Sequence, residues 1–299
     1  MSTALLLLPD FLLIVLGFVL CRHTMLNRSM WDAVERLVYY LLFPVLLFNS
    51  ILKSPLQPLQ TLNLATAAVG VVSCGVLLAF AIGRWPGVDA RLHASGAQTA
   101  FRFNSFIALA LAERLGGPQG LAWIALCIAL CVPLCNVAAV WSLARHGGHS
   151  YGRELLRNPL ILSTVAGLIA NLAGLGFPDA VATTLQRIGL AALPLGLMAA
   201  GAGLRFGGLK AAPGLAAALM AVRHAVLPAV AIGLTAALAL PPEQRTIVVL
   251  FASLPTASSA YVLASRMGGD GAFVAGLVTL STLLGMLSVP LWLALAGAA

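Results

Sequence analysis

Long apolar segments recur along the whole chain and are separated by short polar stretches. Most of them reach about 20 residues, the length that an α-helix needs to cross the hydrocarbon core of a bilayer. Polar and apolar residues do not alternate within the segments, so the pattern does not favour a transmembrane β-barrel. The pattern predicts an all-α polytopic membrane protein with ten transmembrane helices. The expected spans are residues 4–22, 31–52, 64–84, 94–115, 118–143, 158–177, 181–204, 211–240, 244–266 and 271–297. The span at 211–240 is longer than a crossing needs, so we expect it to tilt or to begin late.

The composition agrees with this interpretation. Hydrophobic residues make up 61% of the chain and charged residues only 9%, whereas a soluble domain carries roughly 25% charged residues. Such a chain cannot cover a water-facing surface, and lipid is its predicted solvent. The opening run Leu5–Leu20 lacks a basic start and a small-residue cleavage site. We therefore expect it to be the first span rather than a cleavable signal peptide.

Lysine and arginine predict the orientation. The net charge is +8, and its basic residues lie mostly in loops between spans, so it indicates membrane topology rather than nucleic acid binding. One set of loops carries eleven basic residues, and the other carries Lys53, Arg114 and Arg245. By the positive-inside rule the richer side faces the cytoplasm, which places both termini outside the cytoplasm in the inner membrane. The basic residues within spans are Arg102, Arg187 and Arg223.

The chain resembles itself at a shift of about 150 residues, which is the signature of an internal repeat. We expect residues 1–150 to form a first five-helix repeat and residues 151–299 a second one within a single membrane domain. Because five is odd, the second repeat must enter the membrane inverted, and folds of this kind bind substrate near the midplane. The matched pairs include Pro9 with Pro159, Gly17 with Gly167, Pro44 with Pro194, and Gly116 with Gly268.

A proline interrupts the ninth predicted span, within Ser253–Tyr261. Pro255 removes a backbone donor, and Thr256, Ser258 and Ser259 are suited to cap a new half-helix. One interpretation is a proline kink packed against neighbouring helices. The other is a binding site, because free backbone at membrane depth is tolerated only against protein or a water-filled cavity.

The fourth predicted span has a polar interruption at the matching place. A shift of 152 residues carries Pro255 and Thr256 onto Phe103 and Asn104. Arg102, Asn104 and Ser105 are costly in hydrocarbon and indicate an interior cavity. The coincidence of the two interruptions favours a shared crossover site, where half-helix N-termini would face an anion.

Other polar residues within spans leave alternatives open. Arg102 either snorkels to the cytoplasmic surface or grips a substrate carboxylate, because no acidic residue of its span precedes Glu113. Asn49 is a further candidate for the site. Arg223 and His224 form either a proton relay or an ordinary buried hydrogen-bonding pair, and the second interpretation is favoured.

The sequence offers little support for an enzyme or a metal site. Cys127, Cys131 and Cys135 share one helix face, where small apolar packing is the favoured interpretation. Neither a Cys/His metal spacing nor a metalloprotease or nucleophile-elbow motif occurs. We therefore expect no cofactor, no metal and no enzymatic activity. Asp10 is the main carboxylate within a span, so a carboxylate-based proton pump is not favoured.

Five short motifs occur in the order found in a known family. They lie at residues 31–37, 43–48, 158–161, 193–197 and 254–257, and each of the last four contains a proline. Over essentially its whole length the chain resembles the auxin efflux carrier family, bacterial branch. The resemblance implies scaffold and transport subdomains, crossed broken helices four and nine, and a homodimer through the scaffold.

The resemblance also assigns individual residues. The family's crossover asparagine falls on Asn104 and its helix-nine proline on Pro255, while Phe103 stands where the family usually has a proline. The resemblance implies a secondary transporter that moves small organic anions, such as malonate, malate or auxin-like acids, by alternating access. The alternative is a sodium-coupled carrier of the bile-acid transporter type. The expected substrate-binding residues are Arg102, Asn104, Ser105, Pro255, Thr256, Ser258, Ser259 and Asn49.

Overall fold

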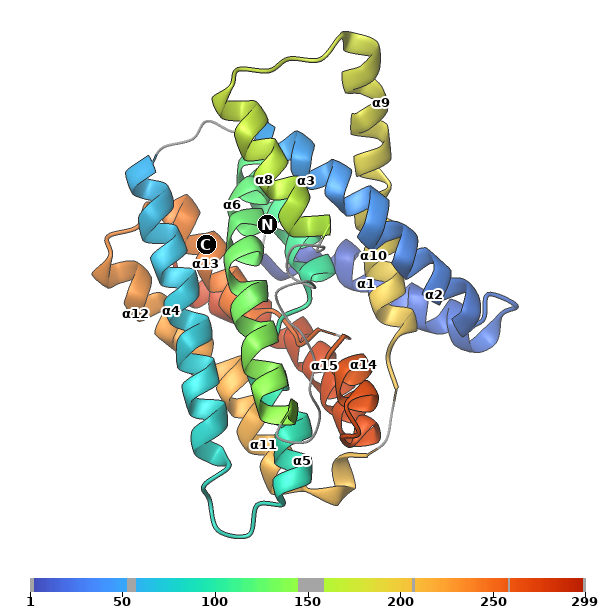
Figure 1. Ribbon diagram of the computed structural model, residues 1–299, viewed down its shortest axis with the longest axis vertical. Helices are drawn as coiled ribbons and strands as arrows, with labels where there is room; N and C mark the ends of the chain where they lie inside the picture. The colour runs from blue at the N-terminus through green and yellow to red at the C-terminus, as the bar shows by residue number, and fades with distance from the viewer. Residues whose placement is uncertain (1–2, 53–57, 145–158, 206–207, 258, 298–299) are drawn as a thin grey trace. The chain divides into compact units, whose positions relative to one another are not determined.

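The computed structural model describes residues 3–52, 58–144, 159–205, 208–257 and 259–297 (Figure 1). Every regular element within these residues is helical, as the hydrophobic pattern predicts. In chain order the elements are α1 (Thr3–His23), α2 (Arg28–Leu37), η1 (Val38–Leu42), α3 (Phe43–Leu52), α4 (Pro58–Ile82), α5 (Ala90–Gly96), η2 (Ala97–Ala100), α6 (Ser105–Ala144), α8 (Pro159–Leu172), α9 (Asp179–Leu190), α10 (Ala192–Ala202), η3 (Leu209–Ala211), α11 (Pro213–Ala221), η4 (Val222–Val226), α12 (Leu227–Ala237), α13 (Pro242–Ser253), α14 (Ser259–Arg266) and α15 (Gly271–Leu295).

Five segments of the described chain are long and apolar enough to cross a membrane. They are Leu62–Ile82, Ala90–Leu143, Asp179–Ala202, Pro213–Ala237 and Gly271–Leu295. Many large apolar side chains in these and neighbouring helices are exposed, among them Leu77 and Leu287. An apolar surface of this kind fits a lipid solvent.

The structure shows where three of the expected spans begin or divide. The long span expected at 211–240 begins late, at Pro213, which occupies the first helical turn where its missing N–H costs nothing. The expected spans 94–115 and 118–143 lie within one apolar segment. Gly117 separates them, with φ 54° and ψ −148°, a conformation that a side chain would disfavour.

The chain forms two compact units, and each unit draws on both halves of the sequence. The first unit comprises Met1–Thr61, Phe106–Ala129 and Tyr151–Gly203. The second comprises Leu62–Ser105, Leu130–Ser150 and Leu204–Ala299.

Glycines bring α1 and α10 together in the first unit. A Cβ atom added at Gly201 would lie 1.8 Å from the carbonyl oxygen of Ile14, and one added at Gly17 would lie 1.9 Å from that of Met198. Small residues at such contacts let helix backbones approach closely, which drives helix association in membranes. In the same unit α3 packs against α8 and α9.

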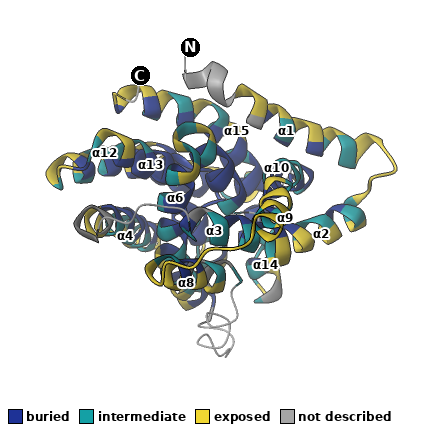
Figure 2. Cartoon of the chain, turned by 90° about the horizontal axis from the view of Figure 1, so that it is seen from above, coloured by how far each residue is buried: buried dark blue, intermediate teal, exposed yellow. Residues whose placement is uncertain are grey.

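In the second unit α13 and α15 pack together, and α14 packs on α15. The helix α13 is buried from Ile247 to Ser253 (Figure 2). The start of α15 is fixed by Asp270, whose carboxylate accepts a hydrogen bond from the Phe273 amide at 2.8 Å. This cap satisfies one of the free N–H groups in the first turn of α15.

Candidate functional site

Two non-helical segments interrupt helices of the second unit, at residues 101–104 and 254–257. The sequence predicts an interruption at both places. Leu254 adopts φ −58° and ψ 144°, because a residue that precedes proline is driven out of the helical region. The other segment has no proline, and Phe101 leaves the helix with φ −124° and ψ −20°. We call residues 101–104 break 4 and residues 254–257 break 9.

The two breaks contact each other directly. The backbone N–H of Asn104 donates to the carbonyl of Pro255 at 2.8 Å, and the hydroxyl of Thr256 donates to the carbonyl of Thr99 at 2.5 Å. The ring of Phe103 packs edge-on against that of Phe251, with ring centres 4.6 Å apart. Asn104 and Thr256 are buried. The segments at the two breaks therefore satisfy hydrogen-bonding groups of each other.

Arg102 lies within break 4, and its guanidinium donates hydrogen bonds to uncharged oxygens. Its guanidinium donates to Oε1 of Gln98 at 3.2 Å, to Oδ1 of Asn136 at 3.1 Å and to Oγ of Ser259 at 3.2 Å. Ser259 is the first residue of α14, so the guanidinium is fixed at the start of that helix. None of these three partners cancels its charge, and the side chain is half-buried.

Arg223 lies in the π-helix η4 and is 1% exposed. Its Nε donates to the carbonyl of Leu254 at 2.6 Å, and its Nη2 donates to that of Phe251 at 3.2 Å. The last carbonyls of a helix have no partner within the helix. The guanidinium therefore caps the C-terminal end of α13, where break 9 begins.

His224 bonds to α15 and not to its neighbour Arg223. Its Nε2 lies 2.8 Å from the hydroxyl of Ser281, and its Nδ1 lies 2.9 Å from that of Ser288. The indole of Trp292 donates to the carbonyl of His224 at 2.7 Å. This carbonyl needs an outside donor because Pro228, four residues later, has no N–H.

Ser281 links this network to break 9. Its hydroxyl accepts a hydrogen bond from the Thr256 amide at 2.9 Å and also lies 3.3 Å from the Thr256 hydroxyl. One turn further along α15, a Cβ atom added at Gly285 would lie 3.2 Å from the Pro255 ring. Break 9 is thus enclosed by α15 on one side and by η4 on another.

Most of the predicted site residues come together in this unit. Arg102, Asn104, Pro255, Thr256 and Ser259 belong to the hydrogen-bonded group at the breaks, and Ser105 begins α6 directly after Asn104. Ser258 lies outside the described residues.

Sequence reasoning missed four polar residues of this group. Gln98 and Thr99 stand at the end of the half-helix before Arg102, and Ser281 and Ser288 lie on α15. A usable signal exists for the last two. Ser281, Gly285, Ser288 and Trp292 recur at helical spacing, which marks one face of α15 as polar and small.

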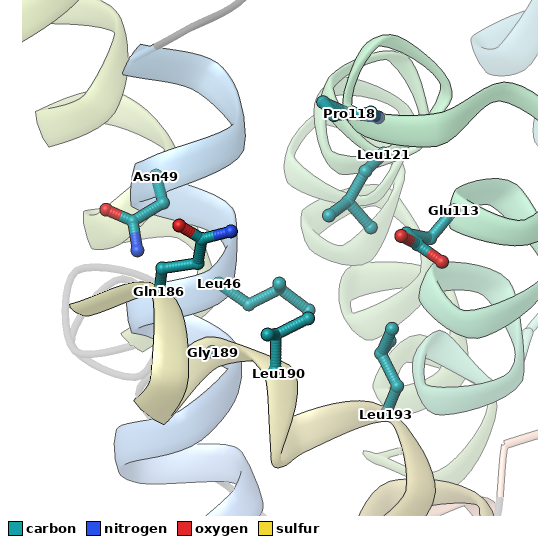
Figure 3. A pocket seen from close by; sticks show the side chains of 9 residues that line it. All are labelled: Leu46, Asn49, Glu113, Pro118, Leu121, Gln186, Gly189, Leu190 and Leu193. Atoms are coloured by element: carbon teal, nitrogen blue, oxygen red, sulfur yellow. The ribbon is translucent and has the colours of Figure 1, made fainter. Parts of the chain in front are cut away.

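Asn49 lies in the other unit, where it lines a cavity of about 130 Å³. The amides of Asn49 and Gln186 project from one side of this cavity, and the carboxylate of Glu113 projects from the other (Figure 3). The Nδ2 atom of Asn49 is buried and has no hydrogen-bond partner. The remaining lining residues are Leu46, Pro118, Leu121, Gly189, Leu190 and Leu193.

Comparisons with known proteins agree on one class. The family model described as "Membrane transport protein" matches residues 138–293, which is more than half of the chain. An "Uncharacterized transporter" of Methanothermobacter thermautotrophicus is 26% identical over 291 residues, covering 95% of each protein. A protein of Rhizobium meliloti named "Putative malonate transporter" is 27% identical over 306 residues, covering 95% of this chain and 92% of that protein.

Proposed function

Because this chain belongs to the auxin efflux carrier family of membrane transport proteins, we propose that it carries small organic anions of the carboxylate class by alternating access. The membrane is the cytoplasmic one, with both termini outside the cytoplasm. The observation that carries the proposal is the position of Arg102, whose guanidinium bonds to Ser259 at the start of α14 and to the neutral oxygens of Gln98 and Asn136.

The arrangement of helix ends favours an anion over a cation. The start of a helix carries a partial positive charge, and its end carries a partial negative one. At each break a carbonyl at the helix end already has a donor, since Thr99 accepts from Thr256 and Leu254 accepts from Arg223. The starts of α6 and α14 carry partial positive charge and the guanidinium of Arg102 carries a full one, and positive charge of this kind attracts a carboxylate.

Element boundaries support the proposed inverted repeat of two five-helix halves, residues 1–150 and 151–299. At a spacing of about 150 residues, α2 to α3 corresponds to α9 to α10, and break 4 corresponds to break 9. Gly117 and Gly268, both with positive φ, end the half-helices that follow the two breaks. Cysteine labelling from each side of the membrane at the ends of the ten proposed spans tests this arrangement.

The cavity of the first unit supplies a second proposed contact. The buried Nδ2 of Asn49 is a donor without an acceptor, and a carboxylate oxygen would satisfy it. We therefore retain Asn49 as a substrate-binding residue of that unit.

Uptake into liposomes tests the proposal. Purified protein should accumulate labelled malonate or malate, which the malonate transporter relative makes the first substrates to try. The Arg102→Ala and Asn104→Ala variants should lose most of this uptake. Arg91→Ala is the matched control, because Arg91 is an exposed arginine of the same unit. Uptake of every tested carboxylate at the wild-type rate by both site variants would remove the assigned site.

A further inference from the structure

We propose that Arg223 is a positioning residue that acts as a permanent, protein-supplied cation at the end of α13 and makes break 9 receptive to anions without a bound metal cation. The inference rests on the proposed function, because it assigns how the same site obtains its selectivity. Arg223 itself does not touch the substrate, since its Nε and Nη2 are engaged with the carbonyls of Leu254 and Phe251.

Both hydrogen-bond acceptors of Arg223 are carbonyls at the end of a helix. The carbonyls of Phe251 and Leu254 belong to the end of α13, where the helix carries a partial negative charge. In transporters with broken helices, carbonyls at such ends coordinate the coupling sodium ion. Here the guanidinium of Arg223 bonds to both carbonyls, so a side chain takes the place that a sodium ion has in such carriers.

The positive charge of Arg223 is buried. Arg223 is 1% exposed and forms no ion pair with any carboxylate that the structure describes. Removing a charge from water without an opposite charge beside it is unfavourable. Two helix-end carbonyls offset only part of this cost, so packing alone gives no reason for an arginine rather than an apolar residue of similar volume.

Hydrogen bonds to α15 fix the backbone and side chain next to Arg223. His224, the next residue, is fixed by Ser281 and Ser288, and its carbonyl is fixed by Trp292. These three partners all belong to α15, which also bonds to Thr256 in break 9 through Ser281. The guanidinium therefore keeps a constant position relative to the break, as a permanent electrostatic element requires.

The charge of Arg223 changes the electrostatic field at break 9. With the negative end of α13 neutralised, the positive start of α14 and the charge of Arg102 dominate there. A fixed charge that acts at a distance favours a doubly charged ligand more than a singly charged one. The inference therefore predicts a preference for dicarboxylates that depends on Arg223.

The test measures affinity as a function of ligand charge. Ligand-induced thermal shifts of the purified full chain give apparent dissociation constants for malonate and for acetate. The Arg223→Met variant should bind malonate about tenfold more weakly and acetate only about threefold more weakly, as expected for a screened charge. Arg223→Lys should recover most of the malonate affinity. In Arg223→Ala, added guanidinium ion should restore malonate binding in part, and Arg91→Met should behave like wild type.

Sodium supplies a readout that needs no variant. Replacing sodium by choline should leave malonate binding by the wild-type protein unchanged. A requirement for sodium, or equal losses for malonate and acetate in Arg223→Met, overturns the inference. Should Arg223→Met fail to fold, Arg223→Lys decides, because it keeps the positive charge. A malonate affinity within about threefold of wild type then supports the charge role, and a greater loss overturns it. Failure of the proposed function looks different: the wild-type protein would then bind and transport no carboxylate at all.

Discussion

The hydroxyl of Thr256 donates to the carbonyl of Thr99 at 2.5 Å, and both residues are fully buried. The two residues are far apart in the sequence: Thr99 lies just before break 4, and Thr256 lies within break 9. The bond supplies the end of one half-helix with the donor that it lacks. It therefore couples the geometry of break 4 to that of break 9.

Removing this hydroxyl should weaken the fold of the second unit. In Thr256→Val the shape is kept, but the Thr99 carbonyl loses its donor, which costs about 1–3 kcal/mol for a buried group. We expect a lower thermal midpoint in detergent and reduced malonate uptake. Thr256→Ser keeps the hydroxyl and is the control. Equal midpoints for the Val and Ser variants would contradict the coupling.

The shape of the Arg102 side chain should matter as well as its charge. A lysine at this position has one compact ammonium group and cannot reproduce a planar fork that bonds to Gln98, Asn136 and Ser259 together. We expect Arg102→Lys to raise KM for malonate more than it lowers kcat. Initial-rate uptake across a range of malonate concentrations measures both. Arg91→Lys serves as the control, and an unchanged KM in Arg102→Lys argues against a substrate-binding guanidinium.

The contact between α1 and α10 should not tolerate a methyl group. In Gly201→Ala the new Cβ would lie 1.8 Å from the Ile14 carbonyl oxygen, and the helices must separate. Overpacking of this kind costs about 1–3 kcal/mol or more. Gly233→Ala is the matched control in α12, because an added Cβ there meets nothing within 4 Å. Thermal unfolding in detergent should show a loss for Gly201→Ala and none for Gly233→Ala.

Asn49 should separate stability from binding. Its Nδ2 is buried without a partner, and such a group costs about 1–3 kcal/mol. Asn49→Leu should therefore raise the thermal midpoint of the ligand-free protein while reducing the shift that malonate produces. A lower midpoint without ligand, together with an undiminished malonate shift, would show that this amide stabilises the first unit and contacts no substrate.

Local chemistry explains how far the sequence alone predicted the site. Pro255 forces Leu254 out of the helical region in any context, so break 9 is visible in the sequence. Break 4 has no proline, yet an arginine, an asparagine and a serine together within an apolar span are costly enough to mark it. The internal repeat aligns these two positions in the sequence.

The sequence does not predict which groups the polar residues of the breaks and of η4 bond to. Asn104 bonds to Pro255 through its backbone N–H, whereas the sequence indicated its side chain. Within the part of the chain that the structure describes, Arg223 and His224 form no hydrogen bond with each other and have no partner in common, although they are adjacent in the chain. The direction of each side chain depends on the π-helical turn of η4, which the sequence does not reveal.

The paired breaks show where the two sources of information divide. The sequence by itself determined that the chain is helical and suited to lipid, and that spans four and nine are interrupted, because backbone sterics and the cost of polar groups in hydrocarbon act locally. Only the tertiary structure decided that Thr256 satisfies Thr99, that Arg223 caps α13 and that Asn49 lies in the other unit. The reason is physical: a hydrogen bond between distant segments depends on how whole helices pack, and many packings satisfy the same local rules.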